Sequence, residues 1–239
     1  VYTEIDIQNF LRAAEYYIRH GIALNAKKIE SLQWEKIEND VAAEPLPKNT
    51  VSAAVAAAMK IIAKKGPWDV TMEKVAEELR LSKSSVYSHF ENKKEMLREV
   101  FLNEARAIMQ FAALNIKKSD TTEEQLYYAV FSIAHYFRLN PDILHALDYL
   151  RTRRLDIKSK EEAEIHFNEH KSQFPLFAAI FENIKTSSGS LLINEDRAEW
   201  IFFILINVLM RCERIQSSRQ FPNEVFRIMY RYIALGLNC

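Results

Sequence analysis

Apolar residues recur at the three- and four-residue spacing of an α-helix along almost the whole chain of 239 residues. Runs in which apolar and polar residues alternate are hard to find, and only four glycines and six prolines interrupt the pattern. The longest apolar run, Trp200 to Met210, is well short of the roughly 18 residues that a membrane span needs. These features predict an all-α protein outside the membrane, long enough for one large domain or two smaller ones.

Charge is balanced overall, with 32 basic and 32 acidic residues, so the net charge favours neither nucleic acid nor a membrane as partner. The balance hides a local surplus, because residues 48–98 hold ten Lys and Arg against six Asp and Glu. Two cysteines, Cys212 and Cys239, make no disulfide framework, and no signal peptide is visible after Val1. We therefore expect a cytoplasmic protein with one basic segment.

Proline, glycine and short polar runs divide the chain into three parts, residues 1–47, 48–97 and 98–239. The first part is predicted to hold helices at 5–20 and 26–40, followed by a proline-bearing linker. The second part opens with a helix at 51–65 that Gly66 and Pro67 stop. A longer helix then reaches about residue 115, and the remaining helices are expected at 122–139, 141–155, 160–185, 195–217 and 222–237.

Residues 71–97 contain two short helices and the start of a third. Thr71 can cap the first helix, whose apolar stripe consists of Met72, Val75, Ala76 and Leu79. Ser82 can cap the second, at about 82–90, in which Val86 and Phe90 stand four apart and face the core. Asn92 can cap the third.

The second short helix has a polar outer side made of Lys83, Ser84, Ser85, Tyr87 and His89. Two short helices joined by a tight turn, the second with a polar outer side, are typical of a helix-turn-helix. Its second helix can enter the major groove of DNA, where serine, lysine and histidine can bond to base edges. Tyrosine hydroxyls and lysines suit phosphates. The same pattern also fits a helical hairpin with a solvated outer face.

From Ala53 to Phe101 the sequence resembles the N-terminal domain of the tetracycline repressor (TetR) family of bacterial transcriptional regulators. The resemblance rests on "AAVAAAMKIIAKKG", "VTMEKVAEEL" and "LSKSSVYSHFENKKEML", with these residues at the family's spacing: Ser82, Lys83, Tyr87, Phe90, Lys93 and Leu97. It implies a three-helix DNA-binding domain followed by a helical domain that binds a small-molecule effector and forms a homodimer, without a cofactor. Val51 to Cys239, 189 residues, fits a family member in size.

By motif position, the resemblance implies two groups of DNA contacts, which include the capping residue Ser82. Contacts to bases or nearby phosphates are expected from Lys83, Ser84, Ser85 and His89, and contacts to the DNA backbone from Thr71, Tyr87 and Lys93. Two departures are expected to lower DNA affinity. Arg80 stands where the family usually has glycine, at a turn position that needs a left-handed conformation. The lead-in carries only Lys48, whereas many members have a more basic arm.

The resulting hypothesis is a ligand-responsive, sequence-specific regulator, a repressor that binds a palindromic operator in double-stranded DNA as a homodimer. No nucleophile–base pair, phosphate loop or convincing metal set indicates an enzyme. The alternative is a helical protein-interaction module on a TetR-like scaffold with weak or lost DNA binding. The acidic residues 1–47, which the family does not account for, favour this alternative. They could pack on the DNA-binding domain, extend the dimer interface or bind another protein.

Some residues of the C-terminal part have both a structural and a functional interpretation. His166 and His170 have a spacing that can hold a metal, but a solvated polar helix explains them better. His135 and His145 could line a pocket or be partly buried structural histidines. Aromatic residues are frequent in this part, and we interpret them as core residues in preference to the lining of an effector cavity. They are Tyr127, Tyr128, Phe131, Tyr136, Phe137, Phe174, Phe177, Phe181, Trp200 and Phe203.

Overall fold

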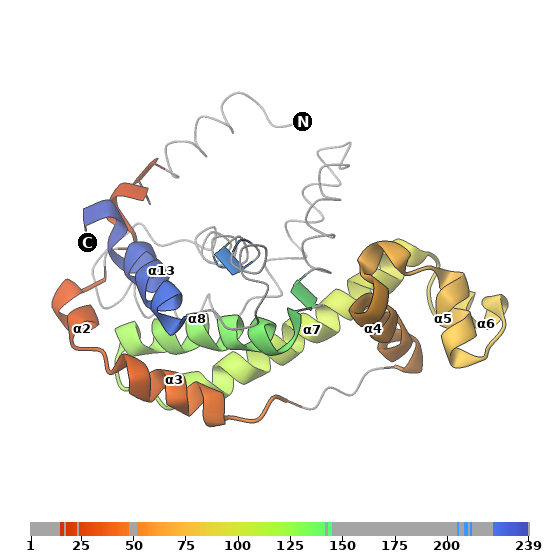
Figure 1. The fold of residues 1–239 in the computed structure, drawn as a ribbon, viewed down its shortest axis with the longest axis horizontal. Coiled ribbons are helices and arrows are strands. Elements are labelled where there is room, and N and C mark those ends of the chain that lie inside the picture. Colours follow the sequence, from red (N-terminus) through yellow and green to blue (C-terminus); the bar gives the residue numbers. More distant parts are fainter. Residues whose placement is uncertain are drawn as a thin grey trace.

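The computed structural model describes residues 15–16, 18–22, 24–47, 52–141, 143–144, 205, 208–209, 211 and 222–238. In these residues all regular structure is helical, which confirms the all-α prediction. No helix in this described part of the chain has the length and apolarity to cross a membrane. Figure 1 shows a small helical head at one end of a long helix and a larger helical body along the rest of it.

The head consists of four helical segments and the start of α7. In chain order these are α4 (Ala53–Lys65), the 3-10 turn η1 (Pro67–Asp69), α5 (Met72–Leu79), α6 (Lys83–Tyr87) and α7 (Lys93–Ile116). Ser52 caps α4 by accepting from the Val55 N–H at 3.2 Å, and Gly66 ends it, as predicted. Buried side chains of α4, α5, α6 and α7, together with Val70 and Phe90, form the head core.

The body is built on the helical hairpin of α7 and α8 (Thr122–Leu139), which run back along one another (Figure 1). Thr121 and Glu124 form a capping box at the start of α8, so the predicted bounds 122–139 are confirmed. Helix α13 (Asn223–Leu235) packs on α8 and continues into the 3-10 turn η3 (Gly236–Asn238).

Helix α7 belongs to both cores. Met96, Leu97 and Val100 lie in the head core, and Ala107 and Phe111 lie in the body core. A single continuous helix therefore joins the head to the body (Figure 1).

The prediction of one helix at 26–40 is wrong. The structure has two, α2 (Ala26–Glu30) and α3 (Trp34–Ala43). Ser31 ends the first by donating its hydroxyl hydrogen to the Lys28 carbonyl at 2.8 Å. Leu32 then turns into the body core, where it is 7% exposed. Burial of this leucine decides the break, and a local helical pattern does not contain that information.

The described part of residues 1–47 packs on the body. Ile29, Ile37 and Val41 are at most 1% exposed and lie in the body core. The Ile22 N–H donates to the Ile233 carbonyl of α13 at 2.9 Å. Of the helix predicted at 5–20, residues 15–16 and 18–20 are described and helical.

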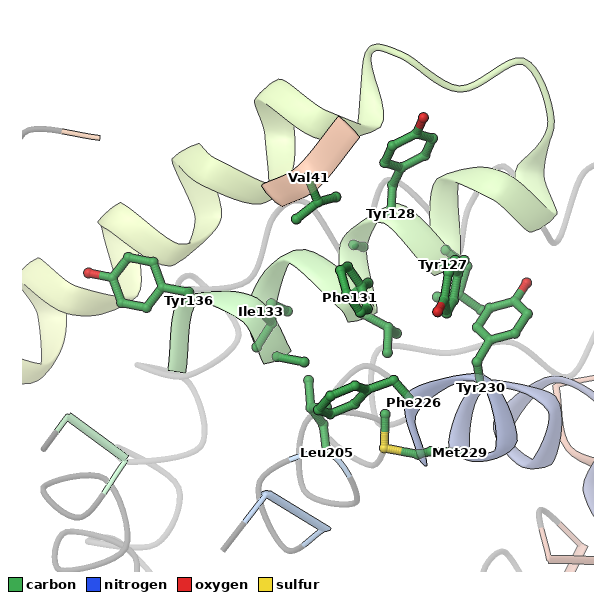
Figure 2. Packing of buried hydrophobic residues seen from close by; sticks show 14 of the residues in the cluster. Val41, Tyr127, Tyr128, Phe131, Ile133, Tyr136, Leu205, Phe226, Met229 and Tyr230 are labelled. Atoms are coloured by element: carbon green, nitrogen blue, oxygen red, sulfur yellow. The ribbon is translucent and has the colours of Figure 1, made fainter. Parts of the chain in front are cut away.

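The aromatic side chains of α8 are core residues, as predicted. None of the five, Tyr127, Tyr128, Phe131, Tyr136 and Phe137, exceeds 5% exposure. Figure 2 shows Phe131, Tyr127 and Tyr230 gathered between α8 and α13. The predicted helices at 160–185 and, apart from a few residues, 141–155 and 195–217 lie outside the described residues. So do the following side chains: His145, His166, His170, Phe174, Phe177, Phe181, Trp200 and Phe203.

Candidate nucleic-acid interface

Helix α5 is closed at both ends by local contacts. The Thr71 hydroxyl oxygen accepts from the Lys74 N–H at 3.2 Å, which confirms the predicted cap. Met72, Val75 and Ala76 are buried in the head core. The helix ends at Arg80, whose backbone is left-handed with φ 56° and ψ 38°, as the turn was predicted to require.

The turn after α5 has the hydrogen bonds of a Schellman motif. The Leu81 N–H donates to the Ala76 carbonyl at 2.9 Å, and the Arg80 N–H donates to the Glu77 carbonyl at 3.1 Å. Glycine usually occupies the left-handed position of this motif, because it has no Cβ to clash. Here an arginine does, and it is the only described non-glycine residue with a positive φ.

Helix α6 begins with a cluster of serine hydroxyl groups. Ser82 caps the helix by accepting from the Ser85 N–H at 3.2 Å. The same Ser82 oxygen lies 2.8 Å from the hydroxyl of Ser84 and 2.9 Å from that of Ser85. Three hydroxyl groups are thus held together at the first turn of α6, where they can donate to or accept from a base edge or a phosphate.

The rest of α6 presents a polar side outward and an apolar side inward. Val86 is fully buried and Phe90 is 5% exposed, which confirms their predicted core positions. Lys83, Tyr87 and His89 are exposed. Tyr87 is the largest of these residues and is 48% exposed. Val86 and Phe90 therefore fix this segment to the head and leave its outer side exposed to solvent.

The predicted extent of this helix, about 82–90, is too long. Helix α6 ends at Tyr87, and His89 lies in the turn that follows. The Ser88 hydroxyl donates to the Ser85 carbonyl at 2.7 Å, which satisfies a carbonyl at the helix end. The Phe90 ring then packs into the head core and sets the path of the chain toward α7.

Helix α7 starts beside α6. Asn92 caps it by accepting from the Glu95 N–H at 3.0 Å, as predicted. The Lys93 ammonium donates to the Trp68 carbonyl at 3.1 Å, which ties the start of α7 to the turn before α5. Thr71, Tyr87 and Lys93, the residues expected to contact the DNA backbone, thus come from the three helices α5, α6 and α7 around one head.

A family comparison decides what kind of head this is. Residues 54–100 match the family described as bacterial regulatory proteins, tetR family. The head is a TetR-family DNA-binding domain. The matched residues run from α4 to the first turns of α7, and they contain the complete helix-turn-helix.

Solved structures of transcriptional regulators share the fold over most of the chain. FadR from Bacillus halodurans, a fatty acid degradation regulator, is 14% identical with a TM-score of 0.57, over 80% of this chain and 98% of that one. FadR from Bacillus subtilis in complex with stearoyl-CoA is 16% identical with a TM-score of 0.58, over 77% and 98%. A tetR-family regulatory protein from Rhodococcus RHA1 is 20% identical with a TM-score of 0.56, over 78% and 99%.

These identities show the fold alone, and comparison with curated protein sequences gave no match. The family and the structures that share its fold are transcriptional regulators rather than enzymes. The chain therefore carries the DNA-binding head of a TetR-family regulator.

Sequence reasoning missed one contact of this TetR-family head. The Glu73 carboxylate of α5 is 3.0 Å from the Lys83 ammonium of α6. That hydrogen bond, with those from its own backbone N–H and the Thr71 hydroxyl, holds the pKa of Glu73 below its ordinary value. No periodic signal could have found the pair, because it joins two helices across a turn.

In the described part of the body, no group of three His, Cys, Asp or Glu side chains is placed to hold a metal ion. His135 is partly buried, with its ring stacked near those of Phe111 and Phe131 at 6.3 and 6.2 Å between centroids. Burial, and then the charge of Arg138, lowers the pKa of His135, so a neutral ring is favoured. These contacts support the structural interpretation of this histidine.

Proposed function

We propose that this chain is a ligand-responsive repressor that binds a palindromic operator as a homodimer in the cytoplasm. Residues 48–97 form the DNA-binding domain, and residues 98–239 form the effector-binding and dimerisation domain. The observation that carries the proposal is α6 itself. Buried Val86, and Phe90 just after the helix, anchor its inner side, while the hydroxyl, ammonium and phenol groups of α6 are on its outer side, with exposed His89 in the turn that follows.

The DNA contacts in this proposal divide by chemistry. The first turn of α6 enters the major groove, where Lys83, Ser84 and Ser85 meet base edges or nearby phosphates, with Ser82 at the cap. His89, in the turn after the helix, meets the same groove. Thr71, Tyr87 and Lys93 contact the DNA backbone and set the orientation of the head.

A homodimer would place its two α6 helices in successive major grooves, about 34–36 Å apart. An effector acts by favouring a dimer whose heads no longer match that spacing, so it must bind the two states with different affinity. Helix α7 supports this role, because one rigid helix carries residues of both the head core and the body core. Any displacement of its body half therefore moves the head.

Long-chain acyl-CoA is the first effector class to test. The fold is shared with a FadR that was solved with stearoyl-CoA, which supports this choice of effector class.

The test is selection of bound fragments from random duplex DNA by the purified full chain, with and without an acyl-CoA. A recovered palindrome with half-sites about one helical turn apart, and its release by effector, is the expected result. Enrichment without a palindrome would contradict the dimer arrangement. The absence of any enrichment at low salt would support the protein-interaction module instead, because phosphate contacts bind DNA most strongly there.

A further inference from the structure

The one basic residue of α6 is already engaged within the head. Lys83 is the first residue of α6, and Glu73 is the second residue of α5. Their side chains are 62% and 42% exposed, and the ammonium lies 3.0 Å from Glu73 Oε1. The pair therefore crosses the turn of the helix-turn-helix on the solvent side.

Two other ion pairs of the head hold lysines away from α6. Lys74 pairs with Asp69 at 2.9 Å, and Lys60 of α4 pairs with Glu78. Neither pair includes a residue of α6. The Glu73–Lys83 pair, by contrast, includes a residue of α6 itself.

An ammonium group has three N–H donors, and the Glu73 carboxylate needs one of them. Two donors remain, and guanine presents two acceptors, O6 and N7, in the major groove. A lysine held by one carboxylate has already lost much of its rotamer freedom, so it loses less when it binds a base. The same tether keeps the ammonium from turning toward phosphates, which carry no sequence information.

We propose that Glu73 is a positioning residue that holds Lys83 as a two-donor reader of one guanine in each operator half-site. This inference rests on the proposed function. It specifies guanine as the base that Lys83 recognises, and Glu73 as the residue that makes this recognition selective.

The test uses the operator selected by the full chain and a scrambled duplex of the same length and composition. At each guanine of the half-site, 7-deazaguanine removes the N7 acceptor and adenine exchanges the O6 acceptor for a donor. Affinities are measured for wild type, Glu73→Gln, Lys83→Met and the double variant. Glu78→Gln is the matched control, because it removes the same charge from the same helix but frees a lysine of α4.

One guanine should be read by the wild type and ignored by Lys83→Met. Glu73→Gln should lower the discrimination at that guanine by about two- to five-fold, as the loss of an exposed ion pair allows. It should also tighten binding to the scrambled duplex, with a steeper salt dependence from one added phosphate contact. Glu78→Gln should leave the discrimination unchanged, and Glu73→Gln should have no further effect on it when Lys83 is Met.

Equal discrimination in Glu73→Gln and the wild type would overturn the inference while leaving the proposed function intact. So would the same loss in Glu78→Gln, or a guanine preference that survives in Lys83→Met. A wild type that selects no sequence would overturn the proposed function together with this inference. Circular dichroism of each variant shows whether the head is folded.

Discussion

Glu38 of α3 and Arg227 of α13 form a bidentate ion pair, although 189 positions separate them in the sequence. The guanidinium Nε and Nη2 atoms each lie 2.7 Å from a different carboxylate oxygen of Glu38. Tyr127 and Asn223 donate to the same carboxylate at 2.8 and 2.9 Å, and Glu38 is only 4% exposed. Burial would raise the pKa of Glu38, but these hydrogen bonds together outweigh it and lower the pKa.

Removal of this carboxylate should loosen the N-terminal segment from the body. Glu38→Ala leaves the Arg227 charge and the Tyr127 hydroxyl without their partner. We expect a loss of about 3 kcal/mol in the free energy of unfolding, at the low end for a buried pair because Arg227 keeps 23% of its side chain exposed. Urea unfolding measures it. Glu35→Ala, an exposed position on the same helix, is the control, and an equal loss there would contradict the role of the pair.

The buried carboxylate of Glu104 has a raised pKa, whereas that of Glu38 is lowered, so the two affect the pH dependence of stability in opposite directions. Burial raises the pKa of Glu104 despite the hydrogen bond that its carboxylate accepts from Tyr136 at 2.6 Å. The folded state therefore binds this proton more tightly than the unfolded state, and stability is lost as pH rises from the unfolded pKa of about 4.3 through the folded pKa. Glu104→Gln should unfold at higher urea than the wild type at pH 8, with a smaller difference at pH 4. A difference that grows toward acid pH would contradict this assignment.

Arg80 stores conformational strain in the turn of the helix-turn-helix. Its φ of 56° costs an arginine about 1 kcal/mol that glycine does not lose. Arg80→Gly should raise the free energy of unfolding by about that amount, as chemical denaturation can measure. Arg80→Ala keeps the Cβ and removes the charge, so it should give no such gain. Equal stabilisation by both changes would point to the charge rather than the backbone.

Gly21 and Gly236 lie against one another where the N-terminal segment meets the end of α13. A Cβ on Gly236 would lie 2.5 Å from the Gly21 nitrogen and from the Arg19 carbonyl group. Backbone atoms on both sides cannot give way easily, so Gly236→Ala should cost about 3 kcal/mol. A Cβ on Gly66 would meet nothing within 4 Å, so Gly66→Ala should cost only the backbone strain of its φ of 81° and ψ of 167°, about 2 kcal/mol.

Hydrogen exchange distinguishes the two glycine variants. The amides of Ile22 and Leu24 donate to carbonyls of α13 at 2.9 and 3.2 Å. They should exchange faster in Gly236→Ala and unchanged in Gly66→Ala. Equal protection in both variants would mean that this contact does not hold the segment.

Tyr87 and Lys93 should act on DNA binding without acting on base preference. Tyr87→Phe removes one hydroxyl, and Lys93→Met removes the ammonium that also bonds to the Trp68 carbonyl. The double variant should bind every duplex more weakly, and the slope of log affinity against log salt should fall by about 0.9 for the lost lysine–phosphate contact. Affinity equal to wild type would remove both residues from the set of backbone contacts. A changed base preference would instead assign them to the residues that contact bases.

The reading head was largely predictable because its contacts are local. The caps Thr71, Ser82 and Asn92 each bond to a backbone N–H three residues ahead, so residue type and spacing suffice to place them. The left-handed turn at Arg80 follows from the same short-range geometry. The reach of α6 was overestimated, because the packing of Phe90, not propensity, ends that helix.

The relations between elements were not predictable from local pattern. Glu73 meets Lys83 only at the angle that α5 and α6 adopt around the head core. Leu32 breaks the predicted helix at 26–40 because the body core receives its side chain. The buried apolar residues of the N-terminal segment, such as Ile29 and Val41, pack against residues of α7, α8 and α13, which are far away in the chain.

The sequence by itself determined that this protein is all-α, that a helix-turn-helix lies at 71–90, and which of its side chains face outward. These properties follow from periodicity, caps and turn chemistry within a few residues. Only the tertiary structure decided that the acidic N-terminal segment is part of the body, clamped through Glu38 to Arg227. Such a contact depends on how distant helices are brought together, and its energy arises only when burial removes both partners from water.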